Sequence, residues 1–309
     1  MLRNIIVIVT LLLVALLPFV TKEHDAETPA GIRIVRNLPY VDGSNNARQQ
    51  LDLYLPRIKL SEKLPLIVWI HGGAWKQGDK RDSPCMELAN HGFAAAAINY
   101  RFSTTDHFPA QIYDCKAAIR WLRAHADEYM YDANRIGVWG ASAGGHLVSM
   151  LGTTGGDKEF EGDLGNPTQS SAVQAVADWC GPTDLTTFNQ QVTLPRFRQS
   201  EPERFINELL GGTPEELPKL AHEASPIFYV SKDDPPFLVV HSIEDPVVPF
   251  EQSNDFVKKL EAAGVKVKFI KVSSNNHMPM TDGNLNAVYE FFKENLKASP
   301  RTETDPDAS

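Results

Sequence analysis

A serine flanked by small residues, Gly140-Ala141-Ser142-Ala143-Gly144, gives a G-x-S-x-G pattern near the middle of the chain. The apolar run 136–139 precedes it and small residues follow, which is typical of a buried strand that turns sharply into a helix. On such a turn the serine hydroxyl projects above the sheet, and the positions two residues before and after it must be very small. The following helix directs its N–H groups and the positive end of its dipole toward the serine. The pattern predicts a nucleophilic Ser142; the alternative is a glycine-rich turn with an idle serine.

A second pattern, His71-Gly72-Gly73-Ala74-Trp75, follows an apolar run that is typical of a core strand. Backbone N–H groups at such a turn can point at one oxygen atom, and acyl transfer develops negative charge on that oxygen. Glycine allows the tight curl and the close approach to substrate that this requires. We expect the oxyanion donors to be the N–H groups of Gly73, Ala74 and Ala143. His71 is expected to anchor the loop by hydrogen bonds, and Trp75 to pack under it or line a pocket.

A serine nucleophile needs a histidine base, and on a strand-turn-helix elbow the chain order is serine, acid, histidine. The histidines after the serine helix are His222, His241 and His277. The first lies in an irregular segment, and the second closes a buried strand, where a structural role is more usual. His277 lies in a loop after the last expected strand, and such loops at the carboxyl ends of strands assemble active sites. We therefore predict His277 as the base.

The acid that orients the imidazole is predicted to be Asp245. It follows the apolar stretch 237–241 in a short loop and precedes a proline. Glu244 is its immediate competitor, although neighbouring side chains usually point in different directions. Asp184 is a second competitor, for which capping of its own loop is the preferred interpretation. Asp178 lies inside an apolar strand, needs a partner if it is buried, and receives no role.

The elements around these residues alternate between strand and helix patterns, which favours an α/β architecture with a mostly parallel central sheet and helices on both faces. The first two strands alternate apolar and polar residues and are expected to be half-exposed antiparallel edge strands. Ser83 is expected to cap a helix that has Pro84 at its first position. The expected strands are 32–41, 50–55, 64–70, 93–99, 136–139, 173–180, 236–241 and 265–272, and the expected helices are 84–92, 109–122, the segment after Ser142, 250–263 and 285–296.

One segment, about 186–230, interrupts the alternation after the sixth expected strand. It is rich in proline and contains short helical pieces such as 203–210. We expect it to form a small insertion, or cap, that shapes a substrate pocket. The alternation around it predicts one catalytic domain over residues 30–296.

The two ends of the chain differ from this domain. Residues 5–17 are apolar except for Thr10, follow Arg3 and are broken by Pro18. This length suits the hydrophobic region of a signal peptide and is short for a membrane span. We predict a signal peptide over 1–22, hence an exported protein in the periplasm or secreted, with an uncleaved N-terminal anchor as the alternative. The polar residues 298–309 are predicted to be a disordered tail.

Composition restricts the partners further. The 309 residues carry a formal net charge of −9 and show no basic stripe, so neither nucleic acid nor an anionic membrane surface is an expected partner beyond the possible anchor. Cys85, Cys115 and Cys180 are far apart and lack zinc-site spacing, so no metal site is predicted, and whether two of them pair is left open. The proposed chemistry requires no metal and no organic cofactor. Oligomeric state is not predicted.

Residues 30–296 resemble the α/β-hydrolase superfamily, especially its carboxylesterases and acetyl esterases with an H-G-G-x-W oxyanion loop. The resemblance rests on HGGAW at 71–75, NYRFS at 99–103, DCKAAIRWL at 114–122, GASAGGH at 140–146, DWCGPTDL at 178–185, PPFLVVHSIEDPVVP at 235–249 and Asn276-His277. The secreted feruloyl and acetyl-xylan esterases are the most similar group. The chain departs from the pattern at Ser242 and at Asn275-Asn276, where relatives often have glycine.

The resemblance implies an α/β-hydrolase fold and a two-step serine esterase mechanism on short-acyl or carbohydrate-linked esters, with Ser142, Asp245 and His277 as triad. Three alternatives stay open. The H-G-G-x-W loop also resembles arylformamidases, which hydrolyse a formamide. A peptidase of the same fold is possible, although no N-terminal propeller region is present to gate it. A binding module without activity would normally have lost the serine or the histidine.

Overall fold

Strand β6 (Tyr131–Ala141), which leads to Ser142, lies near the middle of the sheet in the computed structural model. The structure describes residues 25–27, 31–57, 62–192, 195–197 and 201–298. Over these residues the strands form one nine-stranded sheet in the order β1-β2-β3-β5-β4-β6-β7-β8-β9. The predicted signal peptide or anchor and nearly all of the predicted disordered tail lie outside the described residues. Within them, no helix is long and apolar enough to cross a membrane.

The strands divide into an antiparallel edge and a parallel body. At one edge β1 (Asp25–Glu27), β2 (Ile32–Pro39) and β3 (Gln50–Pro56) pair antiparallel, and β3 pairs in the same sense with β5 (Ala94–Ile98). Parallel pairing then joins β5, β4, β6, β7, β8 and β9. The remaining strands are β4 (Leu64–Ile70), β7 (Ala175–Trp179), β8 (Phe237–Ser242) and β9 (Val267–Val272).

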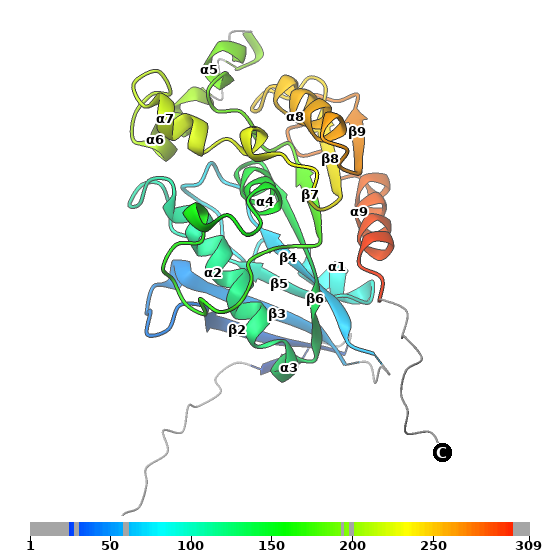
Figure 1. The fold of residues 1–309 in the computed structure, drawn as a ribbon. Helices are drawn as coiled ribbons and strands as arrows, with labels where there is room; N and C mark the ends of the chain where they lie inside the picture. Colours follow the sequence, from blue (N-terminus) through cyan, green and yellow to red (C-terminus); the bar gives the residue numbers. More distant parts are fainter. Residues whose placement is uncertain (1–24, 28–30, 58–61, 193–194, 198–200, 299–309) are drawn as a thin grey trace, which may run out of the picture.

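Helices cover both faces of the sheet, because its strands are apolar on both sides. One face packs against α2 (Ala110–Ala124), α4 (Ala143–Thr153) and α8 (Phe250–Ala262). The other packs against α1 (Cys85–Asn90) and α9 (Asp282–Asn295). Figure 1 shows this layering, with α9 on the opposite side of the sheet from α2. The predicted α/β-hydrolase architecture is confirmed.

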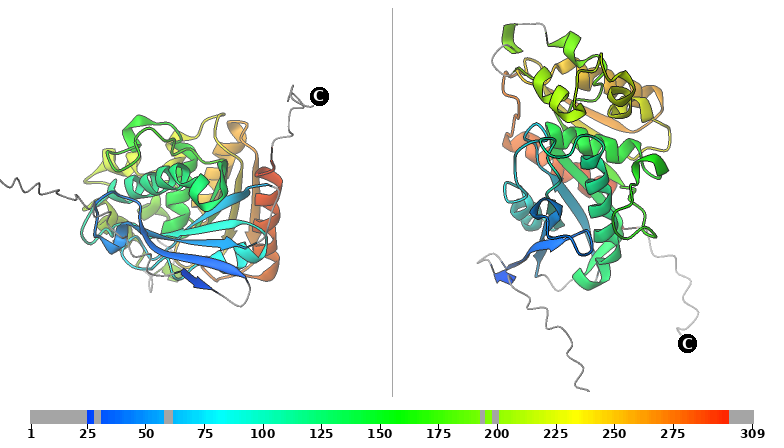
Figure 2. Two further views of the ribbon diagram at one scale, coloured as in Figure 1. Left: turned by 90° about the horizontal axis from the view of Figure 1, so that it is seen from below. Right: turned by 90° about the vertical axis from the view of Figure 1, so that its left-hand side faces the viewer.

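The segment between β7 and β8 forms a small helical cap at the end of the sheet where the strands β4, β6 and β7 finish (Figures 1 and 2). Its helices are short: α5 (Phe188–Gln191), α6 (Glu203–Leu210) and α7 (Pro218–Glu223), with 3₁₀ turns at Pro195–Phe197 and Pro226–Tyr229. The α6 helix is capped at its C-terminus by Gly211, whose φ of 80° places it in the left-handed region. The cap therefore lies above the edge of the sheet where catalytic loops gather.

Three local expectations differ from the structure. Strand β1 was not expected, because its three residues lie in a polar stretch and are too few to show the alternation of apolar and polar residues that is typical of a strand. Strand β3 is buried on both faces over 51–55, rather than half-exposed, because Leu51, Leu53 and Leu55 pack in the core on the α2 side of the sheet and Tyr54 packs on the α1 side. The N-cap residue of α1 is Pro84, not Ser83, and no side chain caps this helix. The other predicted strands and helices are confirmed to within a few residues, except that β6 begins five residues before the predicted 136.

Candidate active site

The turn from β6 to α4 holds Ser142 in a backbone conformation with positive φ, with φ 57° and ψ −122°. A non-glycine residue in this region is strained and must be held by its surroundings. Close packing supplies the restraint: a Cβ added at Gly140 would lie 2.3 Å from the Gly144 oxygen, and one added at Gly144 would lie 2.0 Å from the Ile70 oxygen. The structure thus gives the physical reason for both glycines of the G-x-S-x-G pattern.

The loop after β4 curls beneath the serine. Gly73 has φ 105°, and a Cβ there would lie 2.2 Å from the Gln77 oxygen. Ala74 and Trp75 also have positive φ values, 51° and 56°. Within the described residues, no acceptor is hydrogen-bonded to the N–H groups of Gly73, Ala74 or Ala143. All three residues line the same cavity as Ser142, so donors are available beside its hydroxyl.

His71 anchors this loop. Its Nδ1 lies 2.7 Å from the Gly72 oxygen, its Nε2 lies 2.9 Å from Arg48 Nη2, and its ring stacks on Tyr100 with centroids 4.4 Å apart. The arginine must donate to Nε2, so Nδ1 carries the hydrogen. Burial lowers the pKa of His71 to about 4, and the imidazole is neutral at pH 7. These contacts give His71 the anchoring position expected from the sequence.

Trp75 is buried and also borders the cavity. Its indole Nε1 donates to His146 Nδ1 at 3.1 Å, and His146 Nε2 lies 2.7 Å from the Ala224 oxygen. One chain of hydrogen bonds therefore joins the loop after β4, helix α4 and the cap. This link was missed in the sequence, where His146 is only one of the histidines that precede the acid.

His277 and Asp245 come together from the loops after β9 and β8. His277 Nδ1 lies 2.7 Å from Asp245 Oδ2, while Asp245 Oδ1 accepts backbone hydrogen bonds from Val247 at 2.8 Å and Val248 at 2.9 Å. The carboxylate is fully buried, and the histidine side chain is 19% exposed. Such an arrangement holds the imidazole with Nδ1 protonated and Nε2 able to accept a proton.

In this pair the pKa of Asp245 is lowered and the pKa of His277 is raised. Burial opposes ionisation of Asp245, but hydrogen bonds from His241 and His277 outweigh it and hold the pKa of the carboxyl well below its usual range. Burial alone would lower the pKa of His277, whereas the neighbouring carboxylate of Asp245 raises it above its usual range. The direction for His277 follows from its hydrogen bond to a buried carboxylate, which stabilises the imidazolium.

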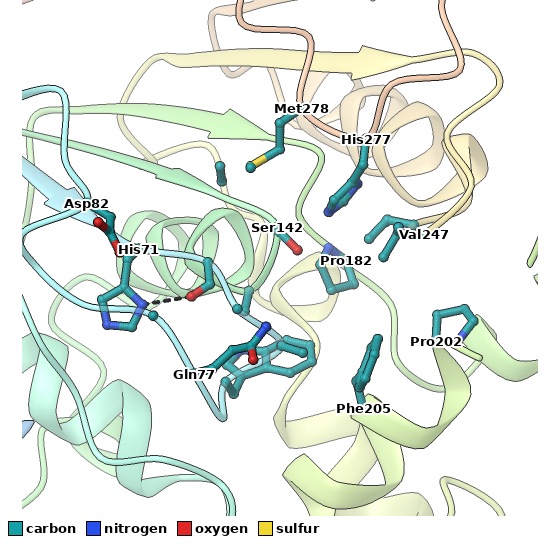
Figure 3. A pocket seen from close by; sticks show the side chains of 18 of the residues that line it. His71, Gln77, Asp82, Ser142, Pro182, Pro202, Phe205, Val247, His277 and Met278 are labelled. Carbon is teal, nitrogen blue, oxygen red and sulfur yellow. Dashed lines mark hydrogen bonds between the residues drawn. The ribbon is translucent and has the colours of Figure 1, made fainter. Parts of the chain in front are cut away.

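Ser142 and His277 face the same cavity, as Figure 3 shows. His277 Nε2 is buried and has no hydrogen-bond partner among the described residues, so its bond to Ser142 Oγ is not formed in this structure. In enzymes without substrate, catalytic hydrogen bonds are often long and tighten only when the substrate binds. The free Nε2 is the atom that the serine proton would reach.

Ser242 holds the histidine loop. Its hydroxyl donates to the backbone oxygen of Asn276 at 2.6 Å, immediately before His277, and the Glu244 N–H donates to the Ser274 oxygen at 3.1 Å. A glycine, which the family pattern led us to expect at position 242, would offer no such hydroxyl. The departure from the family pattern therefore adds a contact that ties β8 to the loop of the base. The sequence marked the departure but not this consequence.

Cys180 is a neighbour of the pair that sequence reasoning missed. It has φ 47°, and its Sγ lies within 4.8 Å of ligand atoms of Asp245 and His277. Thiolate, imidazole and carboxylate together would suit zinc. However, burial raises the pKa of the Cys180 thiol, which opposes the thiolate form that a metal requires. All three cysteines, Cys85 and Cys115 included, are buried and free.

The other candidates have different partners. Glu244 is exposed, while Asp184 caps its loop by accepting from the N–H and hydroxyl of Thr186. Asp178, unassigned in the sequence, accepts from the Ser149 hydroxyl and the Gly181 N–H, both at 2.9 Å. His222 stacks on Phe228, centroids 4.0 Å apart. His241 is buried against Ser253 and the Val248 oxygen, and its Nε2 lies 3.4 Å from Asp245 Oδ2.

A cavity of about 480 Å³ opens above Ser142. Its walls differ in character (Figure 3): on one side lie His71, Gln77 and Asp82, and on the other Pro182, Phe205 and Val247. The apolar wall is completed by Phe188, Pro202, Ile206 and Val248, so the cap and the loop after β8 build it. The cavity can hold a reacting carbonyl that carries a polar substituent toward the first wall and an apolar substituent toward the second.

Comparisons with known proteins agree with this geometry. Residues 51–260 match the family model described as BD-FAE. Among curated proteins, the chain is 32% identical over 239 residues to esterase LipC of Mycobacterium tuberculosis and 33% identical over 253 residues to probable carboxylic ester hydrolase LipM of the same organism. These matches cover 74% and 76% of this chain but 56% of each relative, so the chain spans little more than half of their length.

Solved structures show the same similarity. A truncated carbohydrate esterase from gut microbiota superposes with a TM-score of 0.77 at 32% identity, covering 87% of this chain and 98% of the other. An acetyl ester-xyloside bifunctional hydrolase from Caldicellulosiruptor lactoaceticus superposes with a TM-score of 0.62 at 26% identity, covering 86% of both chains. With the α/β-hydrolase sheet, the strained serine and a matched segment of more than half its residues, this chain belongs to the BD-FAE family.

Proposed function

We propose that this protein is a serine carboxylic-ester hydrolase that acts on short-acyl or carbohydrate-linked esters through an acyl-enzyme. The observation that carries the proposal is the shared cavity: a serine on a strained elbow, unengaged N–H groups beside it, and a histidine whose Nδ1 is held by a buried carboxylate. The named esterases among the relatives support the same reaction class.

The proposed first step is attack by Ser142 on the ester carbonyl. His277 Nε2 takes the hydroxyl proton as the Oγ–carbon bond forms, and Asp245 stabilises the imidazolium. The N–H groups of Gly73, Ala74 and Ala143 donate to the oxyanion, and one such donor is typically worth about 3 kcal/mol of transition-state stabilisation. The carbon–oxygen bond to the alcohol then breaks, and His277 protonates the leaving oxygen.

The second step regenerates the enzyme. A water molecule gives its proton to His277 and attacks the acyl carbon, and the carboxylic acid leaves as the proton returns to Ser142 Oγ. The two walls of the cavity support a substrate with unlike ends, because Phe205 and Val247 offer apolar contact while Gln77 and Asp82 offer hydrogen bonds. Such a substrate is an acyl group esterified to a sugar hydroxyl.

The test is the initial hydrolysis rate on 4-nitrophenyl acetate, butyrate and octanoate, with Ser142→Ala alongside. We expect Ser142→Ala to lose more than about 10³-fold in kcat with an unchanged thermal transition, because the hydroxyl is the nucleophile. A steep fall from acetate to octanoate indicates a small acyl site, and a flat series a broad one. Normal turnover by Ser142→Ala, or no turnover of any ester by the natural protein, would overturn the proposal.

A further inference from the structure

A second cleft, of about 580 Å³, adjoins the catalytic cavity. It lies between strands β2 and β3 and the segment that follows β4, and the carboxylate-bearing residue Asp79 lines both spaces. Its lining is almost entirely polar: Arg36, Asn37, Gln50, Asp52, Lys80, Arg81 and Asn99, with Ala47 and the ring of Tyr54. A substrate that extends from Ser142 past Asp79 would enter it.

The floor of this cleft is a set of buried, paired charges. Lys80 Nζ lies 2.6 Å from Asp52 Oδ1 and 2.7 Å from Asn37 Oδ1, and both Lys80 and Asp52 are buried. Asn99 accepts from the Lys80 N–H at 2.7 Å and donates to Asp79 Oδ2 at 3.2 Å. Because these groups satisfy one another, the floor is rigid before any ligand binds.

Two arginines at the rim keep unengaged donors. Arg36 is 34% exposed, its Nη1 lies 2.8 Å from Asp52 Oδ2, and its guanidinium lies over the Tyr54 ring. Arg81 is 74% exposed and uses only Nε, 2.8 Å from Asp79 Oδ1. Within the described residues, the other guanidinium N–H groups of both arginines have no protein acceptor. Guanidinium groups bind carboxylates through two parallel hydrogen bonds.

We propose that this cleft binds a carboxylate-bearing sugar in the alcohol part of the ester, with Arg36 and Arg81 as its anion-binding residues. The inference rests on the proposed esterase function and narrows its substrate class. The chain carries a net charge of −9, whereas the lining of this cleft has three cations, Arg36, Lys80 and Arg81, against the two carboxylates of Asp52 and Asp79, so the cleft offsets the general repulsion of acidic substrates. The charge of Asp79 at the junction is offset by Arg81 and by Arg48, 3.5 Å away.

The experiment compares two acetylated xylo-oligosaccharides, one with a glucuronic acid side group and one without, and 4-nitrophenyl acetate. In the double variant Arg36→Gln/Arg81→Gln we expect kcat/KM for the acidic substrate to fall about tenfold, mainly through KM. Hydrolysis of the neutral oligosaccharide and of the aryl ester should change less than about twofold. Added salt should weaken the preference of the natural protein for the acidic substrate, because the contacts are partly exposed.

Lys293→Gln is the matched control, since it removes one positive charge from an ion pair on α9, away from the cleft. It should leave all three rates unchanged. An equal loss on acidic and neutral substrates in the double variant, or no preference for the acidic substrate in the natural protein, would overturn the anion subsite while aryl acetate hydrolysis continued. Failure of the natural protein to hydrolyse any ester would instead overturn the proposed function.

Discussion

The serine and the histidine of the candidate triad are held in place by different kinds of interaction. Ser142 follows β6 near the centre of the sheet, where contacts under 2.5 Å for any added Cβ restrict the backbone at Gly140 and Gly144. His277 follows β9, the edge strand, and is held by its own hydrogen bond to Asp245 and by the bond that Ser242 donates to Asn276. The nucleophile is positioned by excluded volume around two nearby glycines, and the base by polar contacts between distant loops.

This difference predicts unlike responses to substitution. Where packing positions a residue, a single added methyl group has a large effect, because the backbone atom it meets cannot move away. Where several hydrogen bonds position a residue, removing one has a small effect, because each typically contributes about 1 kcal/mol and the others remain. Substitutions of the glycines beside the serine should therefore disturb folding and activity together, while those on the histidine side should disturb activity with little loss of stability.

The largest effect is expected from Gly144→Ala. Its Cβ would lie 2.0 Å from the Ile70 oxygen, so the elbow must move. We expect loss of ester hydrolysis and a fall of at least about 3 kcal/mol in the free energy of unfolding. Gly283→Ala, on α9 with no atom within 4 Å of the new Cβ, is the control. Urea unfolding followed by circular dichroism compares them, and equal stability of the two variants would refute the steric explanation.

Asp245→Asn should cost about 10³-fold or more in kcat, because the amide no longer holds the Nδ1-protonated form of His277 and does not stabilise imidazolium. The Val247 and Val248 N–H groups can still bond to the amide oxygen, so the thermal transition should shift by only a few degrees. Rates with 4-nitrophenyl acetate and calorimetry test this. Asp184→Asn, at the loop-capping carboxylate, should keep most of the activity.

The dependence of kcat/KM on pH should reflect the interaction between His277 and Asp245. Only neutral His277 accepts the serine proton, and its pKa is raised above 6.5 by its neighbours, so kcat/KM should fall as pH drops through that raised pKa. In Asp245→Asn the acidic limb should move to lower pH, because a source of the upward shift is gone. Residual activity is measured from pH 5 to 10. An acidic limb that stays in place would contradict the assignment of His277 as base.

The smallest effect is expected from Ser242→Ala, which removes the hydroxyl donor to Asn276. We expect kcat to fall severalfold, corresponding to about 1 kcal/mol, with KM unchanged. Ser231→Ala is the control, because its hydroxyl also closes a loop, by bonding Asp234 at 2.9 Å. Steady-state kinetics on aryl esters separates the two. A loss of kcat in both variants would mean that Ser242 acts only through general stability.

The contrast also explains what the sequence could predict. Alternation of apolar runs and turns was sufficient to predict the parallel sheet, and the elbow was predictable because its G-x-S-x-G pattern spans five contiguous residues. The positions of Asp245 and His277 could be inferred from chain order. The role of Ser242 could not, because it depends on the register that places Ser242 opposite Val272 in the β8–β9 pair.

Contacts between residues far apart in the chain were missed for the same reason. Cys180 reaches His277, and Trp75 reaches His146, through tertiary packing that no local period reports. The cleft built by Arg36, Asp52 and Lys80 draws on three separate segments without a shared motif. The expected cap by Ser83 was wrong because the helix begins one residue later, and turn boundaries depend on surrounding contacts.

The strand order has a consequence for how the protein loses activity. Among the described strands, β9 pairs only with β8 and is half-exposed along its length, whereas β6 is enclosed by β4 and β7. Local opening starts at such edges, so amide hydrogens of 267–272 should exchange with solvent earlier than those of 136–141. Gentle heating would then release His277 while the serine elbow is still folded, and inactivation would be reversible and would precede global unfolding.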